Sequence, residues 1–313
     1  MSETPADVQP RRADEERKQR SDGERKQRSD GERRRWTGVL PSSPLTQFGV
    51  IVVFAMLVFA VFGPIVSPYG PAEQDLLSRL QPPSLAHPLG TDQLGRDVLT
   101  RLSHGARLSL GIAIAVTTVR LVVGTVVGLV AGYAGGWVDE ALMRLVDTLL
   151  AFPGIVLALV IAGVLGPSLV NVMLALAVVG WASYARLIRS SVLSVREREF
   201  VTASRLVGRS RIHVTARHLL PNVVAPVVVL GTLDIGGVIL GTAGLSFLGL
   251  GAQPPTAEWG TMLASGRPYL RQAWWLVNAP GGCIMLTVLG FNLLGDSLRD
   301  RLSPAQSART EQL

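Results

Sequence analysis

The stretch FGVIVVFAMLVFAVFGPIV, residues 48 to 66, is an apolar run without a single charged side chain. Because hydrocarbon offers backbone groups no hydrogen-bond partner, about 20 apolar residues in a row are typical of a membrane-spanning helix. The run exceeds a typical signal-peptide core, and 47 residues precede it. We therefore expect it to remain in the membrane as an anchor.

Five further apolar runs follow along the chain, at residues 108–133, 145–165, 169–187, 223–249 and 276–294. The whole composition agrees, with 48% hydrophobic and 17% charged residues and a mean hydropathy of +0.35, more apolar than an ordinary soluble domain. We predict an all-α membrane protein with six transmembrane helices. The run 145–165 contains Pro153 and is expected to span as one tilted helix, with Arg144 and Asp147 forming a local pair.

The distribution of basic residues predicts the orientation of these helices. Residues 186–217 hold eight arginines, and the segment before residue 47 is also rich in lysine and arginine. Because short cytoplasmic segments carry an excess of these residues, we place both segments in the cytoplasm together with the C-terminal residues. Both termini are then cytoplasmic, and residues 67–104 lie outside.

The N-terminal residues 1–44 form a charged tail in which ERKQRSDG occurs at 16–23 and again at 24–31. With mixed charges and no apolar face, this segment cannot bury enough surface to fold, so we predict disorder. An alternative is contact of Arg33–Arg35 with anionic lipid. We place the transmembrane domain at 45–303 and a second tail at 304–313. The formal charge of +7 lies mainly in the two basic blocks, so we expect a lipid bilayer and no nucleic acid as partner.

The basic segment FVTASRLVGRSRIHVTARHLLPN, residues 200–222, is predicted to form two short amphipathic helices. Gly208 suits a left-handed stop between them, Ser210 can cap the second helix, and Pro221 starts the next span. Such a hairpin would project from the membrane as a docking element. An interfacial helix held at the membrane by its positive charge is the alternative.

The spacing of Ala203, Gly208, Leu220 and Pro221 resembles the cytoplasmic loop of ABC importer permeases, whose pattern is E-A-A, three residues, G, nine residues, I-x-L-P. The chain departs from that pattern at three positions, Thr202, Ser204 and His218. The first departure argues against a specific role for a carboxylate there. The spacing of the loop is kept.

Five further blocks resemble the C-type permease subunit of dipeptide, oligopeptide and nickel ABC importers. The resemblance runs from about residue 45 to 303 and rests on HPLGTDQLGRDVLTRLSHGARLSLGIA (87–113), AGYAGGWVDEALMRLVDTLLAFP (131–153), WASYARLIRSSVLSVREREFV (181–201), LSFLGLGAQPPTAEWGTML (245–263) and VLGFNLLGDSLRDRL (288–302). Similar permeases often carry a glutamate just before LSFLG, where this chain has Thr242.

The resemblance implies half of a translocation pathway in a bacterial inner membrane, completed by a homologous second permease. Two cytoplasmic ATPase subunits or domains would bind ATP and Mg, and an extracytoplasmic binding protein would deliver the cargo. The chain has no Walker A motif, so we expect no enzyme activity and no cofactor in it. Di- or oligopeptides are the expected cargo, with nickel or another small solute as the alternative. A secondary transporter is the rival class, but the sequence shows no internal repeat of the kind expected there.

The resemblance also implies that the loop 196–221 inserts into a groove of the ATPase. Gly208 would be its hinge, residues 203–212 would touch the groove, and the basic side chains would meet acidic groups. Leu220 and Pro221 would link the loop rigidly to the membrane. The predicted coupling residues are Ala203, Ser204, Arg205, Gly208, Arg209, Arg211, Ile212, Leu220 and Pro221.

The outer segments carry two interpretations. Thr91 and Asp92 are suited to cap a short helix through Leu102. The resemblance implies instead that these segments receive the binding protein, with five candidate contact residues: Asp92, Arg96, Asp97, Trp259 and Tyr269. The two aromatic residues could equally be interfacial anchors.

Two charged residues are predicted at membrane depth, where a charge costs at least ~2.5 kcal/mol unless paired or wetted. Asp234 lies among glycines and is the better candidate for the pathway, while Arg120 could also form a salt bridge within or between subunits. The four histidines divide between the two membrane faces, and Cys283 is the only cysteine. We therefore expect neither a metal site nor a catalytic constellation.

Overall fold

The computed structural model describes residues 43–196 and 220–302. The chain divides into two units, Met1–Gln47 and Phe48–Leu313, and the following concerns the second. Residues 1–42 of the predicted tail 1–44, the whole predicted tail 304–313 and the coupling residues 203–212 lie outside the described residues. Within the described ranges the structure is helical and contains no β-strand, as the sequence predicts.

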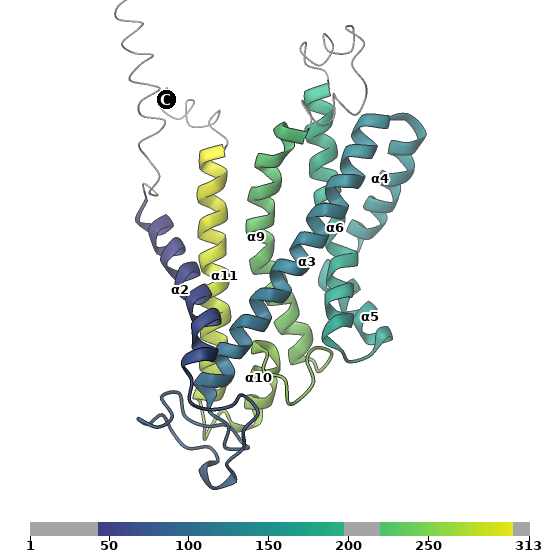
Figure 1. Ribbon diagram of the computed structural model, residues 1–313. Helices are drawn as coiled ribbons and strands as arrows, with labels where there is room; N and C mark the ends of the chain where they lie inside the picture. Colours follow the sequence, from purple (N-terminus) through teal and green to yellow (C-terminus); the bar gives the residue numbers. More distant parts are fainter. Residues whose placement is uncertain (1–42, 197–219, 303–313) are drawn as a thin grey trace, which may run out of the picture. The chain divides into compact units, whose positions relative to one another are not determined.

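The described chain contains eight α-helices and two short 3₁₀ helices (Figure 1). In chain order they are α2 (Pro44–Val66), η2 (Leu76–Ser78), α3 (Val98–Ala134), α4 (Gly136–Ala151), α5 (Gly154–Leu165), α6 (Leu169–Arg196), α9 (Leu220–Phe247), α10 (Trp259–Gly266), η4 (Arg267–Tyr269) and α11 (Trp275–Leu302).

Five of these helices, α2, α3, α6, α9 and α11, are long and apolar enough to cross a membrane. The remaining predicted run, 145–165, is not one helix. It consists of the end of α4 and all of α5, whose axes differ by 89°. Pro153 lacks an amide donor and disfavours helical geometry at the preceding residue, so Phe152 is extended. The prediction of a single tilted helix is therefore wrong, and the sixth crossing exists only if the bent pair counts as one broken span.

α3 begins at Val98, ten residues before the predicted apolar run, because Asp97 caps it. The Asp97 carboxylate accepts hydrogen bonds from the amide and the hydroxyl of Thr100, each at 2.7 Å. The prediction that Thr91 and Asp92 cap this helix is wrong, because the cap is Asp97. The Asp92 carboxylate instead closes a turn by accepting from the amides of Leu94 and Arg96 at 2.8 and 3.0 Å.

The outer segment between α2 and α3 is held by similar local bonds. Asp75 caps η2 by accepting from the Ser78 hydroxyl at 2.6 Å and from the Leu77 amide at 3.0 Å. These bonds hold the pKa of the exposed Asp75 carboxyl below its usual value. Gly95 has a φ of +73°, and a Cβ there would overlap the Asp75 carbonyl, so only glycine fits.

α3 and α6 form the most extensive helix pair, and glycines allow them to approach closely. Gly124, Gly128 and Gly132 follow one another at four-residue intervals on α3. A Cβ on Gly128 would lie 2.6 Å from the Ala185 carbonyl oxygen, and one on Gly132 would lie 2.8 Å from the Val192 Cβ. Small residues at such spacing are typical of packed membrane helices.

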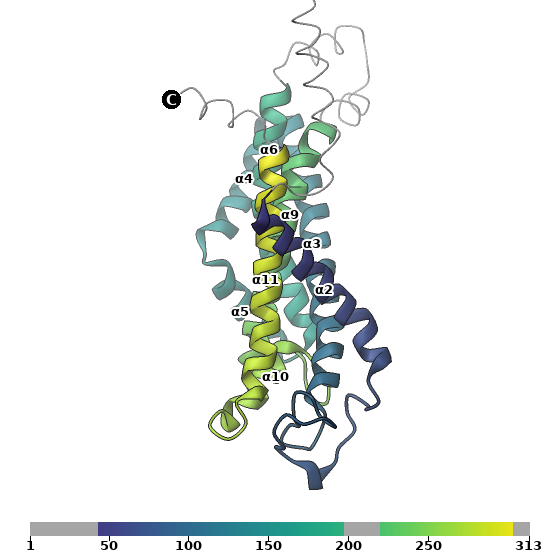
Figure 2. The same cartoon turned by 90° about the vertical axis from the view of Figure 1, so that its left-hand side faces the viewer.

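On the other side of the bundle, α11 pairs with α9, and α2 lies against α11 (Figure 2). This contact again uses small residues, because a Cβ on Gly290 of α11 would lie 2.9 Å from the Val53 Cγ2 of α2. α10 packs between α9 and α11. Its Trp259 is fully buried and donates its indole N–H to the Leu102 carbonyl at 3.1 Å.

Glu258 caps α10 from a buried position. Its carboxylate accepts from the amides of Gly260 and Thr261 at 3.0 and 2.9 Å. Glu258→Ala is expected to lower the free energy of unfolding by about 1–2 kcal/mol, because the cap is lost and two amides stay unpaired. Thermal unfolding in detergent measures this. Glu140→Ala, which removes an exposed carboxylate, is the control, and equal losses in both variants would contradict the prediction.

Candidate functional site

The two charged residues predicted at membrane depth form an ion pair. Arg120 on α3 donates from Nη1 to the Asp234 Oδ1 on α9 at 2.8 Å. Tyr184 on α6 donates its hydroxyl to the second carboxylate oxygen at 3.1 Å. The pair therefore lies within one chain, and three helices contribute to it.

The guanidinium of Arg120 is bound a second time. Its Nε and Nη2 donate to the Leu176 carbonyl of α6 at 2.9 and 2.7 Å. Gly180, one helical turn further along α6, leaves the room for this contact, because a Cβ there would overlap the guanidinium. The planar fork of arginine serves both partners, which a lysine ammonium could not reproduce.

Burial explains why these contacts matter. The Arg120 side chain is 9% exposed and that of Asp234 is 20% exposed. Removal of one partner from such a pair leaves an uncompensated charge, which is far costlier than removal of both. The cluster of Arg120, Asp234 and Tyr184, called the charged triad below, therefore joins α3, α6 and α9 at membrane depth.

A cavity of about 510 Å³ borders the charged triad. α6 and α9 form most of its wall, and the bend between α4 and α5 completes it through Phe152 and Gly154. α9 presents Asp234, Gly237 and Gly241 to the space, at spacings of three and four residues that keep them on one helix face. The wall is thus largely apolar and smooth, with one carboxylate, one guanidinium and two hydroxyl-bearing side chains.

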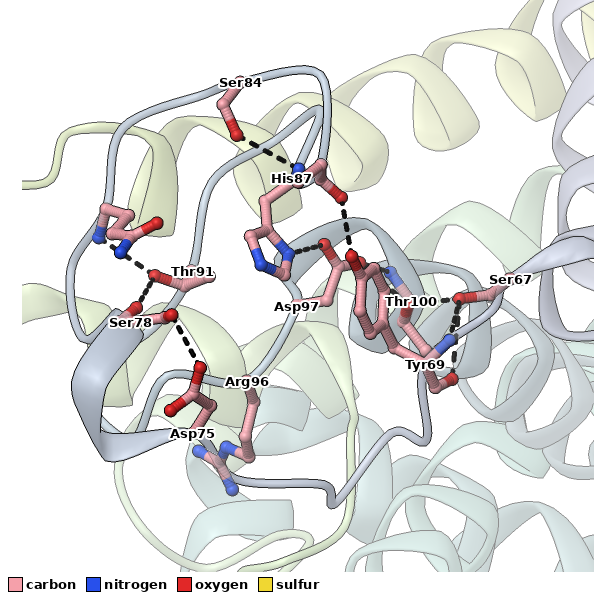
Figure 3. A network of polar contacts seen from close by, with 12 residues as sticks. Ser67, Tyr69, Asp75, Ser78, Ser84, His87, Thr91, Arg96, Asp97 and Thr100 are labelled. Atoms are coloured by element: carbon pink, nitrogen blue, oxygen red, sulfur yellow. Dashed lines mark hydrogen bonds and ion pairs between the residues drawn. The ribbon is translucent and has the colours of Figure 1, made fainter.

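A second polar network lies at the predicted outer end (Figure 3). His87 Nδ1 lies 2.9 Å from the Asp97 carboxylate, and the Tyr69 ring packs on His87 with 4.8 Å between ring centroids. Arg96 Nε donates to the Asp92 carboxylate at 2.6 Å. These contacts fold residues 67–97 onto the start of α3.

Four of the five residues predicted to contact a binding protein are buried in this chain. Asp92, Arg96 and Asp97 are at most 5% exposed, and Trp259 is not exposed at all. Trp259 is therefore no interfacial anchor, and the three charged residues shape the outer segment from within. Only Tyr269, in η4, is partly exposed. A docking role for the segment itself stays a prediction.

The predicted coupling residues between 203 and 212 lie outside the described residues. Leu220 and Pro221 are the first two residues of α9, where a proline is tolerated because its missing amide would have no helical partner. Sequence reasoning missed Tyr184, Gly180 and the Leu176 carbonyl. The pairing of Arg120 with Asp234 could have been inferred, because two opposite charges at membrane depth need partners. The contact of Arg120 with the Leu176 carbonyl could not, because a backbone carbonyl 56 residues away leaves no mark in the sequence.

The family model described as binding-protein-dependent transport system inner membrane component matches residues 124–307. The chain belongs to this family. A second model, the N-terminal TM domain of oligopeptide transport permease C, matches residues 40–83 of this inner membrane component. The resemblance drawn from the motifs is thereby confirmed.

Three related permease proteins are similar in sequence to this chain over most of its length and of theirs. The dipeptide transport system permease protein DppC of Alkalihalophilus pseudofirmus is 45% identical over 85% of this chain and 87% of that protein. The di/tripeptide transport system permease protein DppC of Pseudomonas aeruginosa is 46% identical over 84% and 92%. The nickel transport system permease protein NikC of Escherichia coli is 44% identical over 85% and 96%.

A solved structure supports the fold. A chain of the MetNI methionine ABC transporter in an inward facing conformation matches with a TM-score of 0.52 and 18% identity. The match covers 64% of this chain and 95% of that chain. This inner membrane component therefore shares the fold of that ABC transporter chain. Its family consists of membrane permease subunits, which are not themselves enzymes.

Proposed function

We propose that this permease subunit forms half of a pathway that carries di- and oligopeptides into the cell. The observation that supports it most strongly is the cavity beside the charged triad, in a chain whose relatives include dipeptide permeases. Its volume of about 510 Å³ falls in the range of small-molecule sites. The Asp234 carboxylate is already bound to a guanidinium and a phenol, so a bare nickel ion would meet a neutralised carboxylate next to the positive charge of Arg120. Nickel or another small solute is the second candidate, on account of the relative NikC.

The proposed assembly follows from the family. A homologous second permease completes the pathway, and two ATPase subunits or domains bind ATP and Mg. An extracytoplasmic binding protein delivers the cargo to the outer segments. The loop 196–221 docks on the ATPase, and both termini are cytoplasmic, as the arginine distribution predicts. A secondary transporter would need neither the ATPase nor the binding protein.

Reconstitution tests this proposal. The chain is purified with its partners, placed in vesicles, and its ATPase activity is measured with the binding protein loaded with di- to oligopeptides or with a nickel chelate. Stimulation by the peptide-loaded protein is the expected result. Stimulation by nickel alone reverses the order of the two candidates, and uptake without any ATPase supports the secondary transporter.

Gly208→Val is expected to abolish uptake while ATP hydrolysis and membrane insertion remain, because a β-branched residue is strained in the left-handed geometry proposed for the hinge. Peptide uptake and ATP hydrolysis are measured in the same vesicles. The same replacement at Gly31, in the predicted tail, is the matched control. Unchanged uptake by the Gly208 variant would exclude the hinge assignment.

A further inference from the structure

α4 is fastened to α6 by an ion pair that spans 50 residues of sequence. Arg189 on α6 donates from Nε and Nη2 to the two carboxylate oxygens of Asp139 on α4, at 2.5 and 2.6 Å. This two-pronged geometry gives both strength and a defined orientation. The two side chains are 31% and 15% exposed, so water screens this pair less than it screens a surface pair.

Further contacts along the same interface hold α4 antiparallel to α6. Val146 of α4 is fully buried against Ala182 and Ala185 of α6. Arg186 donates to Asp147 at 2.5 Å, so the predicted pairing of Arg144 with Asp147 is wrong, and Arg144 binds Glu140 instead. The Arg186 pair is more than half exposed on both sides, and such pairs contribute little.

The interface between α4 and α6 connects the segment after α6 with the cavity beside the charged triad. At one end, α6 finishes at Arg196, immediately before the segment 197–219, which our proposed function assigns to the ATPase. Arg196 also donates to the Gly132 carbonyl of α3 at 3.1 Å. At the other end, α4 reaches the bend at Phe152 and Pro153, and the bend residues Leu149, Leu150, Phe152, Gly154 and Ile155 line the cavity beside the charged triad.

We infer that Arg189 and Asp139 are positioning residues that make α4 follow α6, so that movement at the Arg196 end of α6 changes the cavity wall at the bend. The inference rests on the proposed function, because it needs an ATPase to displace that end. The break at Phe152 and Pro153 is what permits the change. It interrupts the helical hydrogen bonds, so α4 can turn relative to α5 while each helix stays intact.

The experiment follows the bend directly in the complete complex. Cys283 is the only cysteine and is replaced by alanine, and Phe152→Cys then provides a reporter at a position 57% exposed beside the cavity. The rate of modification by a membrane-impermeant maleimide is measured with and without a non-hydrolysable ATP analogue. With Arg189 and Asp139 intact, the two rates are expected to differ.

Arg189→Asp is expected to remove that difference while nucleotide binding persists, and the exchange Asp139→Arg with Arg189→Asp is expected to restore it. Asp139→Asn keeps the shape of the side chain but removes its charge. It replaces Arg189→Asp in the experiment if the Arg189→Asp variant does not fold. The matched control is Arg144→Asp, which breaks a pair of comparable length that lies entirely within α4. It should leave the difference unchanged.

Three results would overturn the inference. The ATP-dependent difference could persist in a folded Arg189→Asp or Asp139→Asn variant, it could disappear equally in the Arg144 control, or it could be absent when the Arg189 pair is intact. The last result shows that the bend does not move. Peptide uptake by the same complex tests the proposed function separately. Uptake without any movement of the bend would contradict this inference but not the proposed function.

Discussion

Gly128→Leu is expected to prevent α3 and α6 from packing and to leave little folded protein. The leucine side chain would start from a Cβ only 2.6 Å from the Ala185 carbonyl oxygen and 2.8 Å from the Ile188 Cβ. Backbone atoms and a branched Cβ cannot turn aside as a flexible side chain does. The helices must separate, and the loss is expected to reach roughly 3 kcal/mol or more, at the upper end of overpacking effects.

The measurement is thermal unfolding of purified protein in detergent, together with the yield of monodisperse material. Gly111→Leu is the matched control, since Gly111 lies on the same helix and has open space where its Cβ would be. It should unfold close to the parent protein, because it places leucine on an exposed face. Equal losses in the two variants would show that helix propensity, and not the seam with α6, causes the effect.

Arg120→Leu is expected to destabilise the protein by about 3–5 kcal/mol, because it leaves the Asp234 carboxylate unpaired at membrane depth. The Leu176 carbonyl loses two donors at the same time. The double variant Arg120→Leu with Asp234→Leu should recover much of that loss, since no isolated charge remains. Tyr184→Phe removes a single hydrogen bond and is expected to lower the free energy of unfolding by only about 1 kcal/mol relative to the parent protein.

Thermal unfolding of the four proteins tests the energetic part, and uptake by the double variant tests the functional part. If the charged triad serves the pathway, the double variant folds but does not transport. A double variant less stable than Arg120→Leu would contradict the ion-pair account. A folded double variant with normal uptake would leave Arg120 and Asp234 a purely structural role.

Several features could be predicted because they depend on neighbours in sequence. The run 48–66 spans because every one of its residues is apolar, whatever the rest of the chain does. The run 145–165 was predicted as one tilted helix despite Pro153, and its bend of 89° emerges only in the folded chain. The sequence predicted a short helix through Leu102 apart from the apolar run 108–133, and it missed that both belong to one helix that begins at Val98. His104 and Arg107 interrupt the apolar pattern between them, so hydropathy alone does not join the two.

The outer segment shows the limits of residue type as a guide to exposure. Asp92, Arg96 and Trp259 looked like surface residues because charges and aromatic side chains often face water or the interface. In the folded chain, Asp92 and Arg96 pair with each other, and Trp259 finds the Leu102 carbonyl. Burial of a polar group depends on whether a partner arrives, and the partner comes from the tertiary fold.

By itself, the sequence determined the helical membrane class, the places where apolar runs occur and the family, because lipid requires each segment to satisfy its own backbone and motifs are local. Only the tertiary structure decided that Arg120 meets Asp234, that Arg189 meets Asp139, and that a bent α4–α5 pair borders the cavity. These contacts join residues 50 to 114 positions apart. They depend on how closely glycine-lined helices approach, a distance set by packing among all of them at once.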